Sequence, residues 1–179
     1  MSSFTDRMIR AAKLEPAIYE EVEHDRDAMG QAAGVVVLSS IAAGVGSVAQ
    51  TDLATGLIVG TVVALLGWLI WAFLTWLIGT KLLPEQATEA DMGQLLRTIG
   101  FAAAPGLLRV LGIIPGTSGI VVLLCNIWML AAMVVAVRQA LDFASTLRAV
   151  GVCAIGWLVL VALQGSILMM LGPPGQGGA

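Results

Sequence analysis

Side chains that could carry out acid–base or metal chemistry are few in this sequence. The chain has one histidine, His24, and two cysteines, Cys125 and Cys153. The cysteines form no C-x-x-C pair and lie in apolar stretches, and no H-E-x-x-H is present. We therefore expect two buried free thiols and no zinc site. The nucleotide-binding patterns G-x-x-x-x-G-K-[ST] and G-x-G-x-x-G are also absent. The sequence predicts no cofactor, no metal and no catalytic residues.

A serine in the turn sequence Gly116-Thr117-Ser118-Gly119 is the one candidate nucleophile. The stretch resembles the G-x-S-G motif of rhomboid intramembrane proteases. A serine needs a base to take its proton, and His24 is expected on the opposite side of the membrane. A turn between two spans accounts for the same residues without catalysis, so we predict that Ser118 does not react.

Acidic side chains gather before the first apolar stretch. Glu20, Glu23 and Asp27 stand at i, i+3 and i+7, which places them on one face of a predicted helix. They could bind a cation or a basic partner. The interpretation that we favour pairs them with basic residues at neighbouring span ends, namely Arg97, Arg138 or Arg148. Arg138 also precedes Asp142 by four residues, a helix-surface pair of small energetic weight.

The elements that must position these residues are membrane spans. Residues 28–51, 53–80, 110–137 and 149–179 contain no charged side chain, and each stretch exceeds the roughly 20 residues that cross a bilayer. The chain is 58% hydrophobic and 12% charged, against about 25% charged in soluble domains. Its net charge of -3 is too small to argue for nucleic acid. We predict an integral membrane protein.

The predicted fold class is an all-α bundle of five transmembrane helices with a short N-terminal amphipathic helix. The spans fall near residues 28–48, 53–80, 95–114, 119–137 and 149–171. Residues 1–27 then form a cytosolic N-terminal region, residues 28–171 the membrane domain, and residues 172–179 a disordered tail. The third piece, Leu95 to Ile114, contains Pro105-Gly106 and Arg109, and it is either a kinked span or a re-entrant hairpin.

The distribution of basic residues predicts the orientation. With five spans and the N-terminus inside, eight of the nine basic residues lie on the inner side, and only Arg109 falls toward the outside. A re-entrant third piece would move Arg138 and Arg148 outside and weaken that bias. The positive-inside rule therefore favours five spans in a bacterial inner membrane, with the N-terminus inside and the C-terminus outside.

Charged and polar side chains within the spans are candidate interaction sites. Arg109 and Asp52 are the only basic and the only acidic residue expected in the outer half, and we predict that they pair. Otherwise Arg109 snorkels toward the interface or holds a lipid phosphate. Asn126 lies near the centre of the fourth span. A water-filled passage lined by Asn126, Gln164 and Ser166 would favour a channel.

Two further patterns concern contacts with lipid and with other helices. Phe4, Met8, Ala11 and Ala12 share one face of a short helix that Ser3 could cap, and three basic residues share the other: Arg7, Arg10 and Lys13. Such a helix is suited to an anionic inner leaflet. A second helix, with Pro16 in its first turn, is expected to continue into the first span. Gly56-x-x-x-Gly60 in the second span indicates close helix packing or dimerisation.

Several segments together resemble bacterial members of the Yip (Ypt/Rab-interacting protein) domain family. They are Arg7–Ala12, Tyr19–Glu23 with Gln31-Ala32, Arg97–Pro105, and Ile127–Leu130 running on to Arg138–Asp142. The resemblance implies five spans with a cytosolic N-terminus. Eukaryotic members bind prenylated Rab-type GTPases, but this chain lacks their long cytosolic segment and Asp-Leu-Tyr-Gly-Pro motif.

The sequence thus predicts a non-enzymatic multi-pass membrane protein that binds or organises other membrane components. The alternative is an oligomeric channel for a small solute or an ion. The expected partners are the lipid bilayer, anionic lipid at the basic helix face, and a second copy or another membrane protein.

Overall fold

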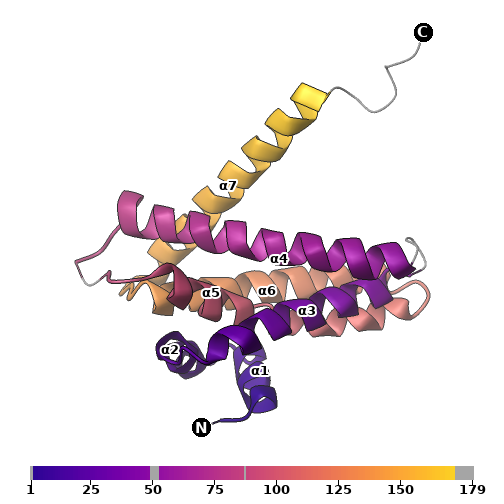
Figure 1. Cartoon of the computed structure of the whole chain (residues 1–179), viewed down its shortest axis with the longest axis horizontal. Coiled ribbons are helices and arrows are strands. Elements are labelled where there is room, and N and C mark those ends of the chain that lie inside the picture. Colours follow the sequence, from indigo (N-terminus) through magenta and orange to yellow (C-terminus); the bar gives the residue numbers. More distant parts are fainter. Residues whose placement is uncertain (1, 49–52, 87, 172–179) are drawn as a thin grey trace.

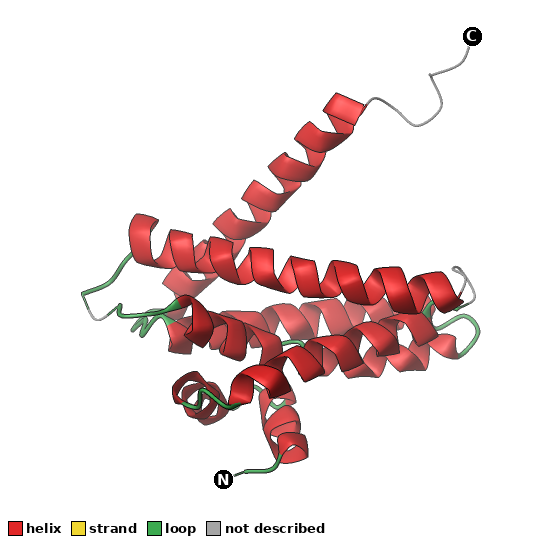
Figure 2. Ribbon diagram, in the orientation of Figure 1, coloured by secondary structure: helices red, strands yellow, loops and turns green. Residues whose placement is uncertain are grey.

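The computed structural model describes residues 2–48, 53–86 and 88–171, without the side chains of residue 55, residues 163–165 and residues 167–171. Every regular element in this part of the chain is a helix (Figure 2). In chain order they are α1 (Phe4–Ala12), α2 (Pro16–His24), α3 (Ala28–Gly46), α4 (Leu53–Leu77), the π-helical turn η1 (Ile78–Leu82), α5 (Met92–Phe101), the 3₁₀ helix η2 (Ala104–Ile113), α6 (Ser118–Ala140) and α7 (Thr146–Leu171). The predicted all-α class is confirmed.

Four segments run alongside one another as a bundle, and α7 leaves it at a steep angle (Figure 1). Helix α3 packs against α4, α5 and η2, while α6 packs against α5, η2 and α7. Helix α2 and the loops at residues 83–91 and 141–145 gather toward one end of the bundle, which we call the α2 end, whereas α1 lies against the middle of the bundle. The turn before α6 lies at the other end, which we call the Gly116 end.

Four segments of the described chain are long and apolar enough to cross a membrane: Ala28–Gly46, Gly56–Leu82, Met92–Ile113 and Ser118–Ala140. The expected fifth span coincides with α7. The uninterrupted run of described side chains in α7, Thr146–Ala162, is apolar, and this run taken by itself is shorter than a span. The structure therefore supports a multi-pass membrane bundle with four candidate spans, and it does not confirm the number five.

The third span is kinked rather than folded back on itself. Helix α5 and η2 follow one another from the α2 end to the Gly116 end (Figure 1). Ten α-helical residues and ten 3₁₀ residues rise by about 15 Å and 20 Å, which together match a hydrocarbon core of roughly 30 Å. Pro105 explains the change of helix type, because it has no N–H and its ring crowds the carbonyl group of Phe101.

Close backbone approach holds α3 against this kinked span. A Cβ atom at Gly46 would overlap the carbonyl oxygen of Arg109, and one at Gly106 would overlap the Ser39 hydroxyl. At Gly100 it would lie 2.7 Å from the Cβ atom of Ala32. Glycine is required at these three positions because any side chain would push the two segments apart.

The N-terminal helices pack on the side of the bundle rather than continuing it. Ile18, Tyr19 and Val22 of α2 are fully buried in a core cluster that includes Phe101 and Ala136. The expected continuous helix from α2 into the first span is wrong, because α2 ends at His24 and α3 begins at Ala28. The Asp25 carboxylate accepts a hydrogen bond from the backbone N–H of Asp27, 3.0 Å away, and stabilises the turn between them.

Candidate functional site

A groove runs along the bundle between α4 and α6, with α3 and η2 beneath it. Three adjoining cavities form it, with volumes of about 270, 530 and 860 Å³. The first two share Ser40, Ala64 and Arg109, and the third shares Trp71 with the first and Asn126 with the second. We call this feature the Arg109 groove. Its lining is mostly apolar, and none of the described residues that line it is acidic.

Arg109 lies at the junction of the first two cavities and carries the charge of the groove. Its guanidinium group donates a hydrogen bond to the side-chain oxygen of Asn126 on α6. Its Nε atom is buried and has no hydrogen-bond partner. An arginine has five N–H donors, so one amide oxygen leaves most of them unused. Two residues that the sequence singled out separately, Arg109 and Asn126, are therefore brought together.

The predicted partner of Arg109, Asp52, lies outside the described residues. A second unpartnered donor belongs to a residue that lines the groove, because the Trp71 indole Nε1 is buried without a hydrogen-bond partner. Two buried donors without acceptors are costly in an apolar environment, by roughly 1–3 kcal/mol each. The groove thus offers positive charge and free donors to a ligand that carries acceptor oxygens.

Small residues on α4 create the space in front of Arg109. Gly56 packs against Gly44 of α3, with its Cβ position 3.6 Å from the Cα atom of Gly44, so the start of the G-x-x-x-G pattern serves internal packing. A Cβ atom added at Gly60 or Gly67 would meet no neighbouring atom within 4 Å, and both glycines line the groove together with Ala64. Gly56, at the start of the G-x-x-x-G pattern, therefore packs against α3, and Gly60, at its end, leaves space for the groove.

The rim of the groove is apolar and exposed. Val59 and Val63 of α4 have exposed fractions of 54% and 61%, and Val122 of α6 is 44% exposed. In a bilayer such side chains contact acyl chains. The groove is consequently accessible from the lipid side.

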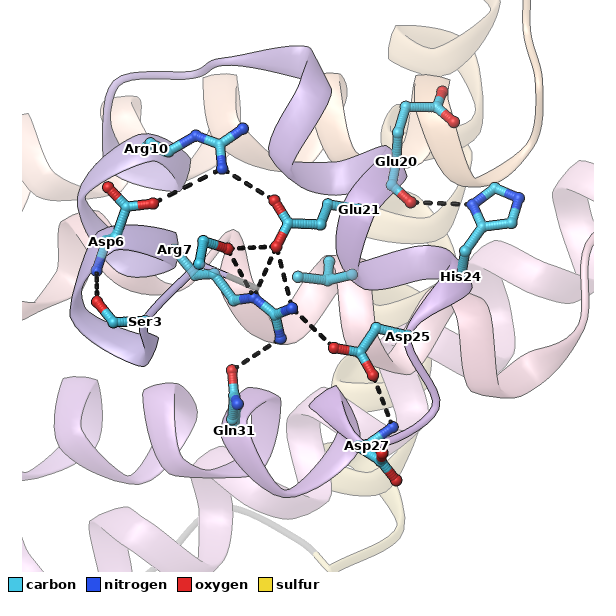
Figure 3. Close-up of polar contacts among 12 residues, drawn as sticks. Ser3, Asp6, Arg7, Arg10, Glu20, Glu21, His24, Asp25, Asp27 and Gln31 are labelled. Atoms are coloured by element: carbon cyan, nitrogen blue, oxygen red, sulfur yellow. Dashed lines mark hydrogen bonds and ion pairs between the residues drawn. The ribbon is translucent and has the colours of Figure 1, made fainter.

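A buried ion cluster fastens α1 to α2 and α3 (Figure 3). The Arg7 guanidinium donates hydrogen bonds to Asp25 at 2.7 Å, to Glu21 at 3.0 Å and to the side-chain oxygen of Gln31 at 3.1 Å. The Arg7 residue is only 2% exposed. Burial alone would lower the pKa of Arg7, but the hydrogen bonds and charges of Asp25 and Glu21 outweigh it and raise that pKa overall.

The sequence predicts that Arg7, Arg10 and Lys13 face an anionic membrane surface. The ion cluster corrects this prediction for Arg7 and Arg10. Arg10 contacts Glu21 at 2.9 Å, Glu15 at 3.1 Å and Asp6 at 3.7 Å. The acidic residues of α2 lie close enough to neutralise both guanidinium groups, which makes a protein contact more favourable than a lipid surface. Lys13 alone of the three is exposed. Ser3 caps α1 as predicted, accepting a hydrogen bond from the Asp6 N–H at 3.2 Å.

The acidic residues Glu20, Glu23 and Asp27 do not meet the arginines as expected. Arg97 donates to the backbone carbonyl groups of Val22 and Glu23. Among the described contacts, no hydrogen bond joins Arg97 to the carboxylates of the three acidic residues. Glu20 accepts a hydrogen bond from the Gln139 amide at 2.6 Å. Asp27 lies beyond the end of α2 and is exposed, so it does not share a helix face with the other two. The predicted pairing is wrong, because the expected arginines bind backbone carbonyl groups or Glu85 and because α2 ends before it reaches Asp27.

The other two arginines that were expected to pair with these acidic residues also bind different groups. Arg138 donates to the carbonyl groups of Phe143 and Ala144 instead of pairing with Asp142, and so caps the end of α6. Arg148 pairs with Glu85 at 3.1 Å. At the Gly116 end, Gly116 has a φ of +82° in the turn before α6, as the turn interpretation of Ser118 expects. His24 lies at the α2 end of the bundle (Figure 1).

Sequence reasoning missed two polar contacts that position these elements. The Trp128 indole donates to the Ala12 carbonyl at 2.7 Å and holds the end of α1 against α6. The Ser40 and Thr61 hydroxyl groups lie 2.9 Å apart and join α3 to α4 beside the groove. Trp71 gave no signal in the sequence beyond its mid-span position. Both cysteines are free and buried in the structure.

A comparison with known proteins identifies the family. The family model of the Yip1 domain matches residues 17–167, which include α2 through most of α7. The chain belongs to the Yip1 domain family. No curated protein and no solved structure matches it.

Proposed function

We propose that this Yip1 domain protein is a non-enzymatic membrane protein that binds an anionic lipid in the Arg109 groove. The observation that carries the proposal is a buried Arg109 Nε without a partner, in an apolar groove whose described lining contains no acidic residue. A charge at such depth is rare unless it serves a partner. A lipid phosphate supplies the missing charge and the missing acceptors together.

The groove has a charged part at Arg109 and an apolar part beside it, and these match the headgroup and the acyl chains of a lipid. A guanidinium group binds phosphate through two parallel hydrogen bonds, which gives geometry as well as energy. The apolar cavity between Trp71, Leu130 and Trp157 accommodates acyl chains beside it. Arg109 precedes the end of η2 by four residues, or about 8 Å of 3₁₀ rise, so a phosphate that enters the groove from the Gly116 end has only a short distance to cover before it meets the guanidinium group.

The alternative, an oligomeric channel, uses the same interior polar residues differently. In this structure Asn126 binds Arg109, and the Ser166 hydroxyl donates to the Ala162 carbonyl of its own helix. The side chain of Gln164 lies outside the described residues. These contacts favour a lipid site over a water-filled passage, because each polar group turns toward a protein partner.

We further propose an inner-membrane protein with the N-terminus inside and the C-terminus outside. The basic residues support this orientation, because those at the α2 end include Arg97, Arg138 and Arg148. The Arg109 groove then opens toward the outer leaflet. The 1–27 region is its cytosolic part, and a second copy of the chain remains a candidate partner of the exposed face of α7, where Trp157 is 60% exposed.

A thermal shift measurement in detergent tests the lipid site. Purified protein receives either phosphatidylglycerol or phosphatidylcholine, and the melting temperature is compared between the two lipids within each variant. We expect phosphatidylglycerol to raise the melting temperature of the wild type more, since a ligand at about 100 times its Kd adds roughly 2.7 kcal/mol to stability. Arg109→Gln should abolish the difference between the lipids.

Two further variants make the result specific. Arg26→Gln removes an exposed charge outside the groove and should keep the preference for phosphatidylglycerol. Ala64→Leu keeps every charge but fills the groove, and it should lose the preference. The proposal fails if Arg109→Gln retains the wild-type preference, whatever the stability of that variant.

A further inference from the structure

A second site lies on α2, none of whose residues lines the Arg109 groove. Glu20, Glu23 and His24 stand on one face of α2, at spacings of three and four residues. One carboxylate oxygen from each glutamate and one ring nitrogen of His24 lie within 4.8 Å of one another. Among the described residues, this is the group of histidine, cysteine and acidic side chains that converges closely enough to share an ion.

Glu23 is the observation that separates this group from an ordinary acidic surface. Its residue is only 3% exposed, and its Oε2 atom has no hydrogen-bond partner. A buried carboxylate without a partner carries a desolvation cost that the fold does not relieve. The Arg97 guanidinium group donates its hydrogen bonds to the backbone carbonyl groups of Val22 and Glu23. The charge of Arg97 therefore acts on the Glu23 carboxylate from nearby, but no hydrogen bond satisfies Oε2.

His24 is prepared to act as a ligand. Its Nδ1 atom lies 2.9 Å from the backbone carbonyl oxygen of Glu20 (Figure 3). A carbonyl oxygen accepts only, so the proton of a neutral ring sits on Nδ1 and the lone pair on Nε2. Metal-ligating histidines almost always donate their other N–H in this way, which fixes the ring and its tautomer.

The surroundings of the group are negative and ordered. Gln139 of α6 donates to Glu20 Oε1 at 2.6 Å, which fixes that carboxylate and leaves its second oxygen for another partner. The charge of Asp142, in the turn after α6, acts on both Glu23 and His24. Acidic charge from two elements thus faces the same point.

From this arrangement we infer that Glu20, Glu23 and His24 bind a divalent transition-metal ion on α2, with Gln139 of α6 orienting the Glu20 carboxylate. One imidazole nitrogen with two carboxylate oxygens is a donor set that suits Zn²⁺ better than Mg²⁺. Ligand atoms around zinc stand about 3–3.5 Å apart, so small side-chain rotations close the site. A fourth position is left for water.

Zinc titration of the full-length protein tests this inference. The protein is purified in detergent without a histidine tag, treated with a chelator, and titrated with Zn²⁺ or Mg²⁺ by calorimetry. We expect one Zn²⁺ per chain and a rise in melting temperature, with Mg²⁺ at least tenfold weaker. His24→Gln and Glu23→Gln should each weaken Zn²⁺ binding at least tenfold, and Gln139→Ala about tenfold through the orientation of Glu20.

Matched controls keep the test decisive. Glu89→Gln removes an exposed carboxylate from the 83–91 loop and should leave Zn²⁺ binding unchanged. The double variant Cys125→Ser, Cys153→Ser removes the thiols and should also leave it unchanged. Because His24 is exposed, its substitution does not disturb the core. The inference is overturned if the wild type binds no Zn²⁺, if His24→Gln and Glu23→Gln bind it as the wild type does, or if Mg²⁺ binds equally well.

Discussion

Arg7, Glu23 and Arg109 show two ways in which this chain treats a buried charge. Arg7 meets two carboxylates and an amide oxygen within 3.1 Å, so its charge is compensated inside the protein. Glu23 and Arg109 each keep a buried polar atom without a partner. A charge that the fold compensates stabilises helix packing, and one that it leaves uncompensated indicates a ligand. The two classes therefore predict opposite effects of neutral substitutions.

Arg7→Gln should destabilise the protein. The substitution leaves Asp25 without its counter-charge and Glu21 with Arg10 alone, and breaking a buried pair from one side costs roughly 3–5 kcal/mol. Chemical unfolding in detergent measures the effect. Arg26→Gln, at an exposed position, should change the unfolding free energy by no more than about 0.5 kcal/mol. Equal stability of the two variants would contradict a structural role for Arg7.

Glu23 should make stability depend on pH in the sense opposite to a salt-bridged carboxylate. Burial, followed by the charges of Glu20 and Asp142, raises the pKa of Glu23 from 4.5 to about 7. The folded protein then binds more protons than the unfolded chain between these values, so its stability falls as the pH rises from about 4.5 to 7. Asp25 has a lowered pKa through its hydrogen bond from Arg7, and its contribution is instead lost as the pH falls.

The difference in unfolding free energy between the wild type and Glu23→Gln isolates the contribution of Glu23. With a chelator present, the stability of the variant relative to the wild type should increase between pH 4.5 and 7 and level off above that range. A difference that stays constant with pH would mean that Glu23 is solvated or paired in the folded protein.

At the scale of elements, the contact between α3 and the kinked third span organises the bundle. Gly46, Gly100 and Gly106 allow it, and Pro105 fixes where α5 gives way to η2. The kink also places Arg109 on the groove side, opposite Asn126. The packing of α3 and the position of the candidate lipid site are therefore linked.

Alanine substitutions at two glycines test this linkage. Gly46→Ala should lower the melting temperature strongly, because the added methyl group overlaps the Arg109 carbonyl oxygen, which belongs to the backbone and cannot move alone. Gly60→Ala adds the same group in open space within α4 and should stabilise the helix by up to about 1 kcal/mol. Similar melting temperatures for both would show that α3 and η2 pack less closely than the structure indicates.

Particular elements show which parts of the fold can be predicted from the sequence. The uncharged stretches predict α3, α4 and α6, because an apolar run longer than a bilayer has few alternatives. Pro105 predicts a break in the third span but not whether the chain crosses, since crossing depends on 3₁₀ geometry. The end of α2 at His24 was missed, because the aspartate turn after it competes with a continuous helix. That error misplaced Asp27 and the expected arginine pairs.

The candidate sites were predicted in part. Arg109 and Asn126 were each singled out, but their contact depends on the rotation of two spans, which hydropathy does not report. Arg7 and Arg10 were assigned to lipid because their helix is amphipathic, yet the same face can meet an acidic helix. Pattern alone does not distinguish a lipid surface from a charged protein surface.

At the scale of the whole molecule, the α2 end of the bundle carries the loops at residues 83–91 and 141–145 together with Arg97, Arg138 and Arg148. The proposed orientation therefore predicts that a reporter active only outside the cytoplasm works when fused after Ala179 and fails when inserted near Glu89. Expression of both fusions in a bacterial host measures this. Equal activity at the two positions would refute the five-span arrangement with the N-terminus inside.

The central claim, that Arg109 holds the phosphate of an anionic lipid, is tested most directly by solid-state NMR. Protein with ¹³C-labelled arginine is reconstituted in phosphatidylglycerol, and dipolar coupling is measured between each guanidinium carbon and lipid ³¹P. The account predicts a coupled guanidinium carbon at hydrogen-bonding range that disappears in Arg109→Gln and persists in Arg26→Gln. If the spectra of the wild type and Arg109→Gln show the same coupling, the groove does not hold a lipid phosphate at Arg109.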